Sequence, residues 1–130
     1  MIVVVDTSVW INHWRDNATT AVLTLRSGIY AGQIVVPDLV LLEATRGAGS
    51  EAQARQVERA LSPYPVVSVL SRELALLGAK QYRELRSVGL TPRRTTDMMI
   101  ASWCVAHNAA LLQDDRDYAL IAPHLGLRLV

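Results

Sequence analysis

The sequence has a single cysteine, Cys104, and no apolar run long enough to cross a membrane. One cysteine cannot form a disulfide within the chain, so the fold must be stabilised by its core, as in proteins of a reducing compartment. Cys104 lies in an apolar stretch, which predicts a buried structural thiol rather than a nucleophile. Apolar runs such as Ile2 to Val5 are far shorter than the roughly 18 residues of a transmembrane helix. We therefore expect no membrane span.

The start of the chain also lacks the features of an export signal. Met1 leads directly into an apolar run that ends at Asp6, with no basic segment and no small-residue cleavage site. We therefore expect a cytoplasmic protein. With 130 residues, of which 51% are hydrophobic, the chain can bury one good core but not two independent ones. This predicts one domain over residues 1–130.

Lysine is scarce as well: Lys80 is the only lysine, whereas the chain has twelve arginines. The formal net charge is only +1, with 13 basic and 12 acidic residues. If five of the acids gather around a metal ion, seven remain against the 13 basic residues, and that excess suits a polyanionic partner. The guanidinium of arginine can bind phosphate through two parallel hydrogen bonds. An arginine-biased genome would give the same count, so this indication is weak.

Short β-branched runs alternate with segments of helical periodicity, which is typical of a parallel sheet covered by helices. We predict a single α/β domain with a mostly parallel sheet of four or five strands, flanked by helices on both faces. The strands are predicted at 2–5, 34–36, 66–70, 109–112 and 127–130. The helices are predicted to follow caps at Thr7 or Ser8, Asp38, Ser71, and Thr95 or Thr96, and to cover 21–31, 51–61 and 118–122.

Four acids fall where such a sheet would bring them together. Asp6 follows the first strand and Asp115 the fourth, Glu43 lies in the helix after the second strand, and Asp97 begins the helix that leads into the fourth. Ligands of parallel sheets bind beyond the carboxyl ends of the strands, where the loops converge. Glu43 is the most specific of the four, because it interrupts an apolar run and should be buried.

Carboxylates packed this closely repel one another unless a cation neutralises them. An all-oxygen set, with His13, His107 and His124 expected elsewhere on the surface or at helix ends, favours Mg²⁺ or Mn²⁺ over zinc. Such an ion can activate water and offset charge on a phosphodiester. We predict Asp6 and Asp97 as the main ligands. Glu43 and Asp115 would bind through water, orient the nucleophile or hold a second ion.

Several neighbouring residues are predicted to assist the acids. Thr7, Ser8 and Thr96 could hydrogen-bond the carboxylates or the scissile phosphate, although a plain helix cap is the more common role for each. Arg46, Arg93, Arg94 and Arg116 flank the acidic segments, and we expect at least two of them to contact phosphates.

Four segments resemble the PIN-domain nucleases, and specifically the VapC toxins of bacterial toxin-antitoxin pairs. They occur in family order and at family spacing over nearly the whole chain, and read V-V-V-D-T-S-V-W-I, L-L-E-A-T-R-G, G-L-T-P-R-R-T-T-D-M-M-I-A-S-W and A-L-L-Q-D-D-R-D-Y. The family's four acids fall on Asp6, Glu43, Asp97 and Asp115, with Asp117 as an accessory acid. The family pattern often has threonine at the position of Gln113 and phenylalanine at that of Tyr118, which leaves open whether Asp114, Asp115 or Asp117 reaches the metal. We prefer Asp115 for its spacing from Leu112.

The resemblance implies cleavage of RNA as the toxin of a type II toxin-antitoxin system. It also implies a homodimer, and inhibition by a VapB-type antitoxin that inserts a segment near the site. None of these follows from composition or spacing.

Other readings of the first aspartate fit less well. A phosphatase of the haloacid dehalogenase type needs a second aspartate where Ser8 stands, and a receiver domain needs paired acids after its first strand. A Rossmann dinucleotide binder needs glycine in the turn after that strand, and residues 7–10 contain none. The remaining alternative is a non-catalytic PIN module that binds RNA or an antitoxin. Such a module has no reason to keep four mutually repelling carboxylates.

Overall fold

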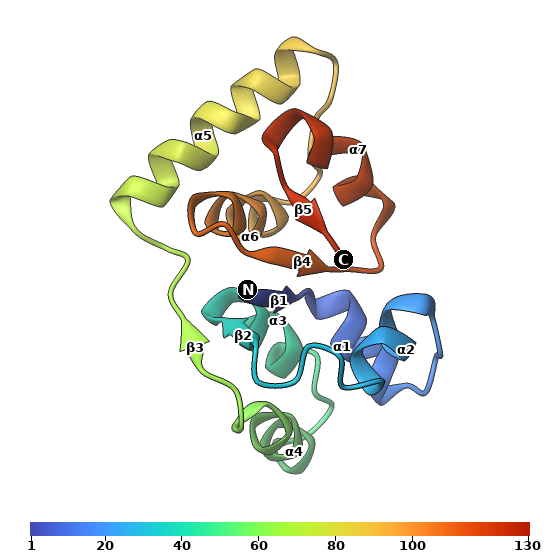
Figure 1. Cartoon of the computed structure of the whole chain (residues 1–130). Coiled ribbons are helices and arrows are strands. Elements are labelled where there is room, and N and C mark those ends of the chain that lie inside the picture. The colour runs from blue at the N-terminus through green and yellow to red at the C-terminus, as the bar shows by residue number, and fades with distance from the viewer.

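The computed structural model describes all 130 residues, as five strands and seven helices. The strands are β1 (Val3–Val5), β2 (Ile34–Pro37), β3 (Val66–Val67), β4 (Ala110–Leu112) and β5 (Arg128–Leu129). The helices are α1 (Thr7–Trp14), α2 (Thr20–Arg26), α3 (Asp38–Arg46), α4 (Glu51–Leu61), α5 (Arg72–Ser87), α6 (Thr95–Ala106) and α7 (Arg116–Leu125). Figure 1 shows their arrangement. No helix combines the length and apolar character needed to span a bilayer.

All five strands are parallel and form one sheet in the order β3-β2-β1-β4-β5. The predicted parallel sheet is therefore confirmed, at the upper end of the expected strand number. Its centre is β1, which pairs Val3 with Ile34 on one side and with Ala110 on the other. Every residue of β1 and β4 is buried, as their continuously apolar sequences predict for strands covered on both faces.

The helices form two groups that cover opposite faces of the sheet. The chain moves from β1 to β2 to β3 in one direction through α1 to α4, and then returns across the sheet to β4 and β5 through α5 to α7. Parallel crossovers are right-handed, so connections that run in opposite directions place their helices on opposite faces. The contacts agree, because α1, α3 and α4 pack together and α5 packs on α6 and α7.

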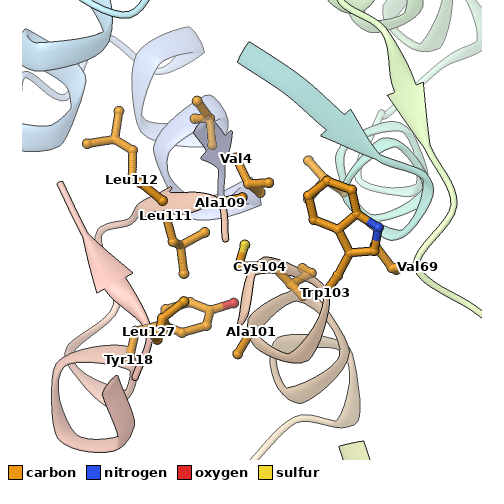
Figure 2. Close-up of a cluster of buried hydrophobic side chains, with 14 of the residues drawn as sticks. Val4, Val69, Ala101, Trp103, Cys104, Ala109, Leu111, Leu112, Tyr118 and Leu127 are labelled. Carbon is orange, nitrogen blue, oxygen red and sulfur yellow. The ribbon is translucent and has the colours of Figure 1, made fainter. Parts of the chain in front are cut away.

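One hydrophobic core links the sheet to both helix groups. Figure 2 shows part of it, where Leu111 and Leu127 pack near Tyr118 and the helix α6. Cys104 lies fully buried in this cluster, and burial raises the pKa of its thiol to about 12. The prediction of an inert structural thiol is therefore confirmed.

Two helices begin differently from the prediction, and in both cases an acid is the cap. Asp6, rather than Thr7 or Ser8, caps α1, because its carboxylate accepts the N–H of Ser8. Asp115 caps α7 in the same way through the N–H of Asp117. These bonds hold both carboxylates at the carboxyl edge of the sheet.

The predicted caps of two other helices are wrong. Asp38 and Thr95 are the first helical residues of α3 and α6, whose caps are Pro37 and Arg94 without a side-chain hydrogen bond. The Asp38 carboxylate instead accepts the N–H of Leu39 and that of Val69, a residue distant in sequence. A tertiary contact therefore uses the side chain that the local pattern assigned to capping.

Element lengths differ most in three places, and the ends of the other four strands differ from the prediction by no more than one residue. Helix α2 ends at Arg26 instead of residue 31, because Gly28 adopts a left-handed conformation with φ of 74°. Helix α7 is longer than residues 118–122: it starts at its Asp115 cap and runs through Pro123 to a left-handed Gly126. Strand β3 keeps only two of the five predicted residues, since it pairs only with β2 at the sheet edge.

Candidate metal centre

The candidate site lies between β1 and β4, where the strand order changes direction. The connections after β1 and β4, which are neighbours at the centre of the sheet, lead to helices on opposite faces. Such a point leaves a crevice at the carboxyl edge of the sheet. The N–H of Asp6 donates to the carbonyl of Leu112 at 2.9 Å, so the two strand ends remain joined at this crevice.

A pocket of about 290 Å³ occupies the crevice. Its lining is almost wholly polar and consists of Asp6, Thr7, Ser8, Ile11, Asn12, Glu43, Arg46, Arg94, Asp97 and Asp115. The structure thus brings together the four acids singled out in the sequence, from the start of α1, from α3, from α6 and from the cap of α7. Two of the four arginines singled out, Arg46 and Arg94, also line it.

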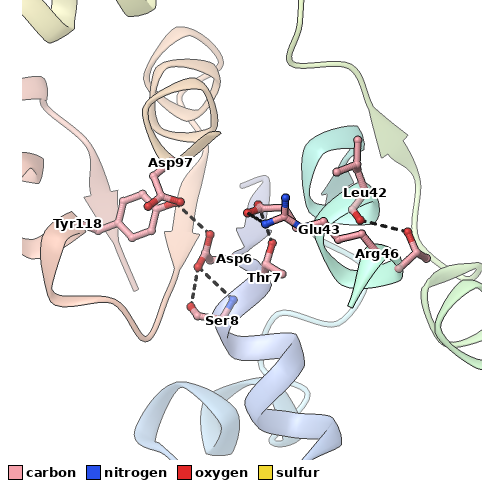
Figure 3. Close-up of polar contacts among 9 residues, drawn as sticks. Asp6, Thr7, Ser8, Leu42, Glu43, Arg46, Asp97 and Tyr118 are labelled. Atoms are coloured by element: carbon pink, nitrogen blue, oxygen red, sulfur yellow. Dashed lines mark hydrogen bonds and ion pairs between the residues drawn. The ribbon is translucent and has the colours of Figure 1, made fainter. Parts of the chain in front are cut away.

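Asp6 is the most firmly held of the four acids. Its side chain is buried, and its Oδ2 accepts the hydroxyl of Ser8 at 2.6 Å and the N–H of Ser8 at 3.2 Å. Its Oδ1 accepts the phenolic hydroxyl of Tyr118 at 3.0 Å. Figure 3 shows Asp6 between Asp97 on one side and Thr7 with Glu43 on the other.

Asp97 is half-buried near Asp6 and carries a perturbed carboxyl group. Its Oδ1 lies 3.2 Å from the hydroxyl of Tyr118. Burial and the negative charge of Asp6 raise the pKa of the Asp97 carboxyl from 3.8 to about 6, although the Tyr118 hydrogen bond and Arg94 act in the opposite direction. Burial and repulsion by Asp6 together therefore favour a bound proton or cation at Asp97.

Glu43 is buried, as the sequence predicted, and it is not left without partners. The hydroxyl of Thr7 donates to its Oε1 at 3.1 Å, and Arg46 lies 4.0 Å from its Oε2. The guanidinium of Arg46 is largely exposed, so this ion pair is loose. Thr7 and Ser8 thus both donate to site carboxylates, and Asp6 takes the capping role.

The three aspartates after β4 have different surroundings. Asp114 accepts hydrogen bonds from Asn12 at 3.0 Å and from Thr19 at 2.7 Å, so it ties the α1–α2 connection to the loop after β4. Asp117 forms an ion pair with Arg93 at 3.2 Å. Only Asp115 lines the pocket, although one of its oxygens also caps α7.

The remaining predicted residues lie outside the pocket lining. Thr96 is half-buried in the first turn of α6 and makes no side-chain hydrogen bond. Arg93 is engaged by Asp117, and Arg116 is exposed at the start of α7. The residues that the sequence did not single out are Asn12, Ile11 and Tyr118.

The pocket's chemistry fits a divalent cation of the Mg²⁺ type. The donors are carboxylate oxygens, and burial, together with the charge of Asp6, raises the pKa of Asp97. No three Asp, Glu, His or Cys side chains stand together as a complete set of ion ligands. Mg²⁺ commonly binds only one or two protein carboxylates and keeps several waters. Asp6 and Asp97 are suited to be that pair, with Glu43 and Asp115 within the same pocket.

The PIN domain family model matches residues 3–122, which include all four acids. The chain therefore belongs to the PIN domain family.

The chain is also similar in sequence to individual proteins, at low identity. Ribonuclease VapC11 of Mycobacterium tuberculosis and VapC ribonuclease Mb1587 of Mycobacterium bovis are each 26% identical over 123 residues, which cover 93% of this chain and 92% of theirs. The fold is similar to that in the crystal structure of VapBC2 from Rickettsia felis bound to a DNA fragment from their promoter. That similarity has a TM-score of 0.79 at 20% identity, over 100% of this chain and 98% of the other.

Replacing Asp97 by asparagine is expected to stabilise the metal-free protein at neutral pH. Because the native pKa is raised, the native state binds this proton more tightly than the unfolded chain does. The stabilisation of the native state by this proton is complete below pH 3.8 and is lost as the pH rises through about 6. Each pKa unit corresponds to about 1.4 kcal/mol, but solvent screens a half-buried group, so we expect a gain of about 1 kcal/mol at pH 7.5.

Urea unfolding in the presence of a chelator at pH 4.5 and pH 7.5 measures this effect. The gain in the free energy of unfolding of Asp97→Asn over the wild type should be smaller at pH 4.5 than at pH 7.5. The free energy of unfolding of the exposed variant Asp16→Asn should differ from that of the wild type by the same small amount at both pH values. An equal advantage for Asp97→Asn at both pH values would contradict the perturbed carboxyl group.

Proposed function

We propose that this chain is a metal-dependent endoribonuclease that acts as the toxin of a type II toxin-antitoxin system. The observation that carries the proposal is the convergence of Asp6, Glu43, Asp97 and Asp115 on one polar pocket. The relatives whose names state an activity are ribonucleases, and their similarity extends over 93% of this chain. Since RNA is the proposed substrate, we also propose a cytoplasmic location.

In this proposal Asp6 and Asp97 would hold Mg²⁺ or Mn²⁺. Asp115, which also lines the pocket, would be a further ligand of the ion. The ion would supply a more acidic water and offset charge on the phosphoryl oxygens. Glu43, which accepts the hydroxyl of Thr7, would orient the attacking water, bind the ion through water or hold a second ion. Ser8 keeps the Asp6 carboxylate oriented.

The arginines at the rim explain how a phosphodiester could enter an acidic pocket. Arg46 and Arg94 both line the pocket, and neither has a close carboxylate partner, because the contact of Arg46 with Glu43 is 4.0 Å long. Guanidinium groups in this position can bind the phosphates on either side of the scissile bond. Arg93 would be available only after release from Asp117, and Arg116 is placed further from the pocket.

Asp6→Asn is expected to reduce RNA cleavage by at least about 100-fold, because the metal provides several kcal/mol of charge stabilisation in the transition state. The measurement is the cleavage of labelled RNA with Mn²⁺, with Mg²⁺ and with chelator. Asp16→Asn is the matched control, since Asp16 is an exposed aspartate just beyond α1 whose only ion pair, with Arg26, lies outside the pocket. Cleavage that persists in Asp6→Asn or in chelator would indicate a contaminating nuclease and favour a non-catalytic PIN module.

Neutral substitution of the rim arginines should weaken RNA binding and its dependence on salt. Arg46→Gln and Arg94→Gln are each expected to lower the slope of log K against log salt by about 0.7, the value for one contact with a single-stranded phosphate. The Asp6→Asn background keeps the RNA intact during the titration. Arg83→Gln, an exposed position on α5, is the control. Unchanged slopes would make both arginines ordinary surface charges.

A second hollow is suited to a protein partner. It has a volume of about 570 Å³, lies between α1, α3 and α4, and shares Ile11 with the acidic pocket. Its lining is mostly apolar and includes Trp14, Ala44, Val57 and Ala60. Similar solved structures are VapBC complexes. We propose that a VapB-type antitoxin lays an apolar segment in this groove and thereby covers the acidic pocket.

Ala60→Trp, which narrows the groove, is expected to weaken antitoxin binding at least about tenfold, because a misplaced bulky group prevents close packing. Ala52→Trp is the matched control, since Ala52 is an exposed alanine of the same helix outside the groove. The test adds a VapB-type antitoxin that inhibits the wild type to RNA cleavage assays. The wild type and Ala52→Trp should be inhibited at equal concentrations, and Ala60→Trp should stay active. Equal inhibition of all three proteins would exclude the groove as the antitoxin-binding site.

The homodimer stays a prediction from the family resemblance, and the single domain over residues 1–130 stays a prediction from the length and composition of the chain.

A further inference from the structure

Tyr118 belongs to the core, yet its hydroxyl reaches the acidic pocket. Its side chain is only 1% exposed, and its phenolic oxygen lies 3.0 Å from Asp6 Oδ1 and 3.2 Å from Asp97 Oδ1. Its backbone N–H donates to the carbonyl of Asp115 at 3.2 Å in the first turn of α7. One residue therefore contacts three of the four acids, and Figure 3 shows it beside two of them, Asp6 and Asp97.

The hydroxyl is especially important for Asp97. Asp6 has two further hydrogen bonds from Ser8, but Tyr118 is the only hydrogen-bond donor to the Asp97 side chain, which forms no ion pair. A carboxylate on a helix can rotate about two side-chain bonds, so one directed hydrogen bond decides where its oxygens point. The hydroxyl carries one proton, which Asp6 Oδ1 and Asp97 Oδ1 share as acceptors, so the phenolic oxygen between them sets the spacing of the two carboxylates.

We propose that the Tyr118 hydroxyl positions Asp97 against Asp6 so that the two carboxylates can bind one divalent cation. This inference rests on the proposed function, and it assigns to Tyr118 the role of a positioning residue that acts through the two ligands. Hydrogen-bond partners of metal ligands typically change metal affinity by about 10- to 100-fold when they are removed. The ring of Tyr118 has a separate role, since it packs in the core with Leu111 and Leu127 (Figure 2).

The test compares Mn²⁺ binding by the wild type, Tyr118→Phe and Tyr118→Leu, measured by electron paramagnetic resonance of free Mn²⁺. Tyr118→Phe keeps the ring and removes the hydroxyl, and we expect its affinity to fall about tenfold. Tyr64→Phe is the control, because Tyr64 is half-buried and its hydroxyl makes no hydrogen bond to another side chain. Unfolding curves establish that each variant is folded under the assay conditions.

The outcomes separate this inference from the proposed function. Equal Mn²⁺ affinity of the wild type and Tyr118→Phe overturns the positioning role and leaves the proposed metal site intact, as does a loss confined to Tyr118→Leu. A wild type that binds no Mn²⁺ overturns the metal-dependent function. In that case a crystal structure of metal-free Tyr118→Phe still decides the role of Tyr118: a reoriented Asp97 side chain supports it, and an unmoved one overturns it.

Discussion

The parallel pairing of β1 with β4 is the constraint on which the acidic site depends. Residues 3–5 and 110–112 are more than a hundred positions apart in the chain, yet they lie side by side at the centre of the sheet. Their carboxyl ends are joined by the hydrogen bond from Asp6 to Leu112. The loops beyond them lead to helices on opposite faces, and the space between those helices is where the acids meet.

The site places like charges in a partly buried pocket, where solvent screens them poorly. The cost is visible at Asp97, whose pKa is raised by burial and by Asp6. The chain reduces this cost with neutral donors rather than with close cations. Ser8 and Tyr118 donate to Asp6, and Thr7 donates to Glu43. Such hydrogen bonds orient the carboxylates while leaving the charge for a bound ion, which a tight arginine pair would neutralise.

The two helix caps connect this electrostatic arrangement to the fold. Asp6 and Asp115 each start a helix, and their carboxylates interact with the N-terminal N–H groups of that helix. Helix capping therefore uses two of the side chains that the proposed metal site needs. Asp114, next to one of them, joins distant parts of the fold, because it accepts hydrogen bonds from Asn12 in α1 and from Thr19, the cap of α2.

The sequence by itself determined the parallel sheet, the approximate elements and the four acids. Continuous β-branched runs such as Val3 to Val5 are favourable only when buried on both faces, and a glutamate inside an apolar helix needs a buried polar partner. Only the tertiary structure decided which aspartate after β4 lines the pocket, which residues cap α1, α3 and α6, and that Tyr118 reaches the acids. Those outcomes depend on neighbours from distant segments. Asp114, Asp115 and Asp117 are chemically identical and lie within four residues, so only the partners that the fold brings to each of them can distinguish their roles.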